Sequence, residues 1–271
     1  MFKFGIGFFV IALFFTIGTG IGNAQMYNPN QYSNPVIQKM YYNQMMTTKA
    51  IGGLIQGHMI KAGVNAANGK TGTRRSAQIK KDPLQFRPAN VTVITDEQLA
   101  QMTKNAQEKQ ELENLFNSAI SSYAETAGKD GFPYNDLAYA FNYFVVNNYH
   151  VYHDVLKSYK GYSNFGIIDI SKLPNYVNLD GERTVYNQFR GVLSSNPSVA
   201  KLTDAEKEKF TALMAIMTNV PWTMYEAGIK SGNDEAIKGA RQLAKQNLEN
   251  LFGTSPENIL INSSGVTVKG N

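Results

Sequence analysis

The sequence predicts a mainly α-helical protein, a single domain of about five helices around one core with minor β-structure. Three observations support this class. Apolar side chains recur at three- and four-residue spacing over long segments, as in residues 112–123. Helix-capping residues precede several of these segments. The β-prone runs, at residues 91–94 and 259–268, are too short to build a large sheet.

The first two helices are expected in the order in which they occur. Thr95 followed by Gln98 forms a capping box, and the helix that it starts ends near Gly128. A second helix starts at residues 135–136, with Asn135 as its cap and Asp136 in its first turn, and continues to about Leu156. The short apolar run at residues 91–94 is interpreted as a strand preceding the first helix.

The next segments carry clear boundary signals. Residues 182–195 form a shorter helix, and Thr203 with Glu206 forms the capping box of the helix that follows. Pro221 has no N–H for the carbonyl four residues earlier, so we expect this helix to kink or break there.

The last elements are a helix and a hairpin. The final helix lies between Asn233 and Gly253, residue types that favour its two ends. Residues 259–268 contain two β-prone runs around an Asn-Ser-Ser-Gly turn, which predicts a small hairpin.

The N-terminus has the pattern of a secretory signal peptide at residues 1–24. Lys3 precedes an apolar run, residues 4–17, and small residues stand at Gly22 and Ala24. The signal predicts export to a periplasmic or extracellular location, with cleavage after Ala24. The alternative is a retained membrane anchor, because residues 4–21 reach the minimum length of about 18 residues for a span.

The chain then divides into a leader and a domain. Residues 25–90 are expected to be a flexible leader and basic linker, with a weak helix near residues 36–60. The helical globular domain is expected at residues 91–268. Basic residues concentrate between positions 61 and 87, and the remainder is close to neutral, so we expect no nucleic-acid partner.

Chemical motifs are sparse in this sequence. It contains no cysteine, which excludes disulfides and a thiol nucleophile. We identify no catalytic residue and no cofactor-binding motif. His150 and His153 are the candidate metal ligands, because side chains three positions apart on a helix share a face. The alternative reading is two ordinary histidines near a helix end.

Tyrosines crowd the second predicted helix. Tyr139 and Tyr143 share a face, which Tyr134 extends, and an exposed tyrosine face suits contact with a glycan or a protein. The alternative is a central helix that is buried nearly all round.

Residues 132–149 and 240–259 together resemble an uncharacterised family of exported bacterial helical proteins, a domain of unknown function. The resemblance covers about residues 91–268 and implies a bacterial envelope or extracellular location, with no catalytic residue. We therefore expect an exported, non-enzymatic binding or envelope-associated module without a stable membrane span after signal removal. Its partner would be an envelope protein or a glycan. The alternative is a metal-assisted hydrolase using His150 and His153.

Overall fold

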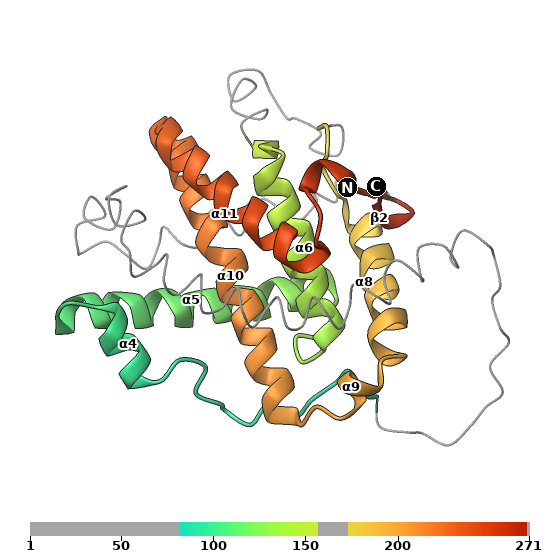
Figure 1. Cartoon of the computed structure of the whole chain (residues 1–271), viewed down its shortest axis with the longest axis horizontal. Helices are drawn as coiled ribbons and strands as arrows, with labels where there is room; N and C mark the ends of the chain where they lie inside the picture. Colours follow the sequence, from blue (N-terminus) through green and yellow to red (C-terminus); the bar gives the residue numbers. More distant parts are fainter. Residues whose placement is uncertain (1–81, 157–172, 270–271) are drawn as a thin grey trace, which may run out of the picture.

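The computed structural model describes residues 82–156 and 173–269 and is mainly helical, as predicted (Figure 1). The helices are α4 (Asp96–Met102), α5 (Ala106–Asp130), α6 (Leu137–Tyr152), α8 (Leu179–Ser194), α9 (Pro197–Ala200), α10 (Asp204–Ser231) and α11 (Asp234–Phe252). A 3-10 turn, η3 (Pro256–Asn258), leads into the antiparallel hairpin of β1 (Ile259–Asn262) and β2 (Gly265–Val268).

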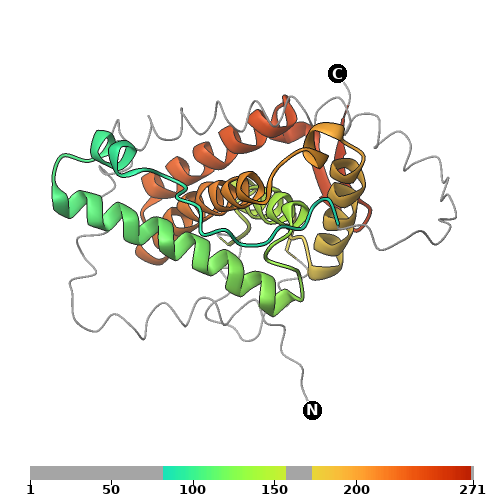
Figure 2. The same ribbon diagram turned by 90° about the horizontal axis from the view of Figure 1, so that it is seen from below.

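Helix α6 is the centre of the bundle. It contacts α8, α10 and α11, and nearly all of its side chains are buried. In Figure 1, α5 runs across the direction of the other long helices, and Figure 2 shows it from below. The side chain of Asp136 caps α6 by accepting a hydrogen bond from Ala138 N. The helix therefore starts within a residue of the predicted position, but its cap is Asp136 and not Asn135.

The region before α6 differs from the prediction in two ways. The capping box of Thr95 and Gln98 is present, but the helix it starts is the short α4, and a second cap at Asn105 starts α5. The predicted strand at residues 91–94 is wrong. Val93 and Ile94 instead pack against a cluster that includes Phe116 and Ile216. Their apolar side chains are therefore partly buried against helices, without strand pairing.

Helix α10 continues through Pro221, so the break considered at that position does not occur. The proline cannot donate to the carbonyl of Met217. Asn247, a fully buried residue of α11, donates to this carbonyl from Nδ2 at 2.9 Å and to Asn148 Oδ1 at 2.8 Å. A side chain from the neighbouring helix thus supplies a hydrogen bond that the α10 backbone cannot.

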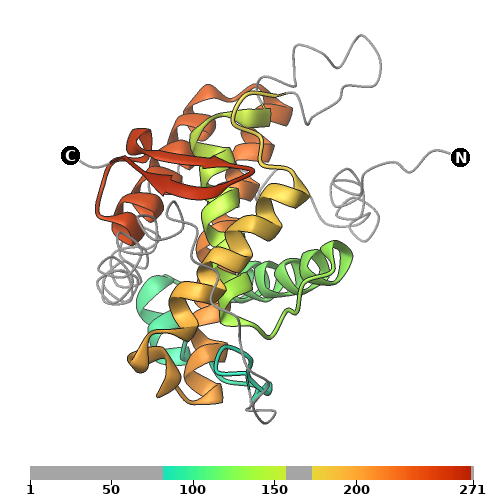
Figure 3. The ribbon, with the colours of Figure 1, turned by 90° about the vertical axis from the view of Figure 1, so that its right-hand side faces the viewer.

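The predicted hairpin is confirmed, and it lies against α8 (Figure 3). The amide of Gln188 on α8 covers part of its β2 edge. Gln188 Nε2 donates to the Val266 carbonyl at 2.8 Å, and Gln188 Oε1 accepts from Val266 N at 2.8 Å. These two bonds occupy the backbone groups that a further strand would pair with at this residue.

Residues 82–86, which we call the arm, belong to the packed structure although we expected them in the linker. Leu84 and Phe86 are 0% and 4% exposed, so the packing starts at least seven residues before the expected domain start at Val91. Figure 2 shows the chain running from the arm across the bundle to α4. The arm is followed by residues 87–92, which we call the connector.

Several sequence-based expectations lie outside the described residues. They are the signal peptide at 1–24, the leader with its helix near 36–60, and the linker up to residue 81. Across residues 82–156 and 173–269, no helix combines the length and the apolar character that a bilayer crossing requires.

Candidate functional site

Of the three tyrosines predicted to form a contact face, one is exposed and two are buried. Tyr134 is 50% exposed, but Tyr139 and Tyr143 are 0% and 8% exposed. The interpretation of all three as one surface is therefore wrong, because α6 is central and buries both tyrosines that lie within it.

The two buried tyrosines belong to an aromatic cluster between α5 and α6. The Tyr139 ring stacks on Phe132 with centroids 4.7 Å apart, and the Tyr143 ring meets Tyr123 edge-on at 5.2 Å. Tyr143 Oη donates to Asn219 Oδ1 at 3.3 Å. Burial raises the pKa of Tyr143 to about 12, so its hydroxyl stays neutral.

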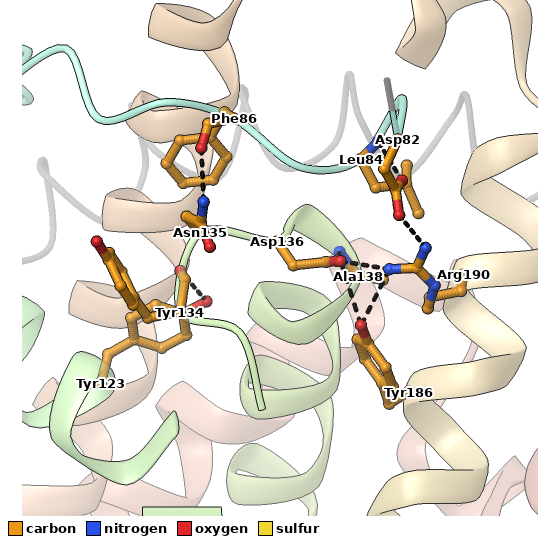
Figure 4. Close-up of polar contacts among 10 residues, drawn as sticks. All are labelled: Asp82, Leu84, Phe86, Tyr123, Tyr134, Asn135, Asp136, Ala138, Tyr186 and Arg190. Atoms are coloured by element: carbon orange, nitrogen blue, oxygen red, sulfur yellow. Dashed lines mark hydrogen bonds and ion pairs between the residues drawn. The ribbon is translucent and has the colours of Figure 1, made fainter. Parts of the chain in front are cut away.

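Tyr134 lies in the loop between α5 and α6, and the backbone of this loop is held on both sides (Figure 4). Tyr123 Oη donates to the Tyr134 carbonyl at 3.0 Å. The next residue, Asn135, donates from Nδ2 to the Phe86 carbonyl at 2.7 Å and accepts from Phe86 N at its own carbonyl at 3.1 Å. An exposed ring therefore stands on a fixed backbone.

His150 has a structural role in the protein interior. Its Nε2 accepts a hydrogen bond from Val177 N at 2.9 Å, and its ring stacks on Tyr176 with centroids 5.3 Å apart. Burial, with a smaller contribution from His153, lowers the pKa of His150 to about 3. The imidazole is therefore neutral, and the Nε2 lone pair that would hold a metal already has a partner.

His153, at the end of α6, lies between the rings of Tyr149 and Tyr152. Burial and the nearby charge of Arg241 lower the pKa of His153. Its Nε2 is buried and has no hydrogen-bond partner. Within residues 82–156 and 173–269, the His, Asp and Glu side chains form no group of three that could hold a metal ion.

The structure contains a polar site that the sequence did not predict. Arg190 of α8 donates from Nη2 to Asp82 of the arm and from Nη1 to Asp136 at the start of α6 (Figure 4). Tyr186 Oη, which accepts from Arg190 Nη1 at 3.0 Å, donates to Asp136 Oδ2 at 3.2 Å. We call these four side chains the clasp.

The two carboxylates of the clasp have different electrostatic environments. Burial raises the pKa of Asp136, and the charge of Arg190 and the hydrogen bond from Ala138 N oppose this shift only in part. Burial also acts on Asp82, but the hydrogen bonds from Arg190 and Leu84 N outweigh it and lower the pKa of Asp82. Arg190 thus forms ion pairs with the fully buried Asp136 and with the partly exposed Asp82.

The arm adds main-chain contacts to the clasp. Leu137 N donates to the Leu84 carbonyl at 3.1 Å, and Gln85 forms an isolated antiparallel bridge with Asp136. Alternate side chains of the arm, Leu84 and Phe86, are buried, whereas Gln85 is exposed. The alternation of Asp-Pro-Leu-Gln-Phe is the signal that could have identified this extended segment from the sequence.

The comparisons with known proteins define the family and no activity. A family of unknown function, DUF6683, matches residues 6–158 and 181–269. The match confirms the resemblance to a family of unknown function and extends beyond residues 91–268 into the N-terminal segment. No curated protein and no solved structure matches the chain. Since the family match covers most of the sequence, the chain belongs to the family of unknown function DUF6683.

Proposed function

We propose that the protein is exported and acts as a non-enzymatic module that binds another envelope component, either a protein or a glycan. The observation that carries the binding role is the exposed ring of Tyr134 on a loop fixed by Tyr123, Asn135 and the arm. An aromatic ring with a hydroxyl offers both apolar area and a hydrogen bond to such a partner.

The fixed backbone is what distinguishes Tyr134 from an ordinary exposed side chain. A loop that is already ordered loses little conformational entropy when a partner binds, so more of the contact energy contributes to affinity. Leu260 on β1 is a useful comparison, since it is similarly exposed, at 42%, but lies on the hairpin.

Photo-crosslinking in the native host tests the contact. Replacing Tyr134 by a photoreactive phenylalanine should give a specific crosslinked species, and the same replacement of Leu260 serves as the matched control. A protein partner gives a peptide adduct by mass spectrometry, and a glycan partner gives co-sedimentation with isolated cell-wall polysaccharide that Tyr134→Ala weakens. Equal results at both positions would contradict a contact at Tyr134.

The proposed export rests on the signal pattern at residues 1–24 and has its own test. The intact mass of protein recovered from the envelope or the medium should lack these residues, so that the chain begins at Gln25. A bulky residue in place of Ala24 should block this processing. Full-length protein in the membrane would indicate an anchor, and full-length protein in the cytosol would contradict export.

The rival activity, a metal-assisted hydrolase using His150 and His153, requires His150 to leave Val177 N. Metal analysis of untagged protein separates the two functions. Stoichiometric zinc that is lost in His153→Ala would favour the hydrolase over the binding module.

A further inference from the structure

We propose that the arm, residues 82–86, is exchangeable between two copies of the chain, so that each copy can insert its arm into the clasp of the other. The result is an arm-exchanged dimer with the same contacts that the arm makes within one chain. This inference does not depend on export or on Tyr134.

The contacts that hold the arm are made with residues distant in the sequence. Asp82 meets Arg190, Leu84 meets the backbone of Leu137, and Phe86 meets Asn135 through hydrogen bonds in both directions. Main-chain hydrogen bonds combined with burial of alternate side chains are how proteins bind an extended peptide from another molecule. The site therefore recognises the arm as a short ligand would be recognised, whichever chain supplies it.

The arm site strongly favours being filled. Leu84 and Phe86 expose large apolar surfaces if the arm leaves, and Arg190 loses one of its two carboxylate partners. An empty site is thus disfavoured relative to one filled by either copy, and the geometry of the connector decides between the two.

The connector, residues 87–92, is suited to leading the arm either to its own domain or to a second copy. Most of it is exposed, and it includes Pro88. Beyond it, Val93 and Ile94 pack against the cluster that includes Phe116 and Ile216. Fully extended, its six residues reach about 20 Å. Ala89 N donates to Glu208 Oε2 at 2.6 Å on the path within one chain.

Asn90 has a backbone conformation that the connector adopts on the path within one chain. Its φ is +52°, in the left-handed region, and its side chain is exposed. A β-branched residue there disfavours this left-handed conformation by about 5- to 30-fold, whereas glycine adopts it without steric cost. A β-branched residue at position 90 therefore shifts the arm from its own chain toward a second copy, and it leaves the residues of the arm site unchanged.

The test is the molar mass of the protein, purified without residues 1–24, by light scattering after size exclusion over a wide range of concentrations. Asn90→Val should increase the dimer association constant by about 5- to 30-fold for each exchanged arm, and the matched control Asn90→Gly should remain monomeric where the wild type is. Phe86→Ala added to Asn90→Val should abolish the dimer, because the arm then holds its partner weakly.

Circular dichroism establishes that each variant is folded. If Phe86→Ala prevents folding, Asp82→Asn in the Asn90→Val background replaces it, because this change removes only the ion pair and should also weaken the dimer. Monomeric Asn90→Val at every concentration would overturn the proposal. A dimer that neither arm substitution weakens would overturn it too, since its contacts would lie elsewhere.

Discussion

Arg190 balances two carboxylates at once, and one of them, Asp136, is fully buried. Replacing this arginine by methionine keeps most of the apolar stem but leaves the Asp136 carboxyl without a cation. Removing one partner of a buried ion pair costs about 3 kcal/mol or more of unfolding free energy. We therefore expect Arg190→Met to lower stability by about 3 kcal/mol in urea unfolding.

A second substitution separates charge from packing. Asp136→Asn retains an oxygen that can cap α6 through Ala138 N, but it removes the buried charge. In the Arg190→Met background it should restore part of the lost stability. If the double variant is as unstable as the sum of the two single ones, the clasp does not act through this charge pair.

His150 predicts a dependence of stability on pH. Its folded-state pKa of about 3 lies below the ordinary value of 6.5. Between these values the unfolded chain binds a proton that the folded protein does not, so the contribution of His150 to stability falls as the pH decreases below 6.5 and is constant above it. One such proton gives a slope of up to about 1.4 kcal/mol per pH unit.

The variant His150→Gln should be less sensitive to acid than the wild type, as measured by urea unfolding between about pH 4 and 7. Glu182 contributes with the opposite sign, because burial and nearby Asp130 raise its pKa to about 8, so that stability decreases as the pH rises toward that value. Glu182 is common to both proteins, so the difference between them reports on His150. Parallel pH profiles would contradict the assignment.

At the scale of elements, Asn247 joins α11 to α6 through Asn148 and to α10 through the carbonyl of Met217, four residues before Pro221. Asn247→Ala removes two buried hydrogen bonds and should cost about 2 kcal/mol of unfolding free energy. Pro221→Ala gives α10 an N–H for the Met217 carbonyl, so the same asparagine substitution should cost about 1 kcal/mol less in that background. Equal costs in both backgrounds would show that Asn247 does not compensate for the proline.

The sequence was informative where a signal is local. The caps at Thr95, Thr203 and Asn233 and the turn of the hairpin depend on neighbouring residues, and each is present in the structure. It was misleading where the deciding partner is remote. Nothing near Pro221 reveals Asn247, and nothing near Asp82 reveals Arg190.

The candidate site shows the same distinction. The spacing of Tyr139 and Tyr143 correctly puts them in one helix, but burial depends on how α6 is surrounded. Similarly, His150 and His153 lie at the end of one helix as predicted, but His150 Nε2 accepts a hydrogen bond from Val177 N, which is distant in the sequence. Periodicity identifies a face, and only packing decides whether that face meets water.

At the scale of the whole molecule, the arm moves the expected domain boundary. Limited proteolysis of the protein should leave a stable fragment that begins at or before Asp82 and retains Leu84 and Phe86, because both side chains are buried. Mass spectrometry of the fragment checks this. A fragment that starts after Val91, with the arm lost and an unchanged melting temperature, would contradict the role of the arm.

The amide of Gln188 has a consequence for the order of folding events. It precedes Val266 by 78 positions, so α8 emerges before the hairpin from any pore through which the chain passes N-terminus first. When β2 forms, the group that occupies its outer edge is already available. Gln188 can therefore bind the β2 edge as soon as the strand forms. Neighbouring chains at high local concentration then find no unpaired backbone at Val266 with which to begin an intermolecular sheet.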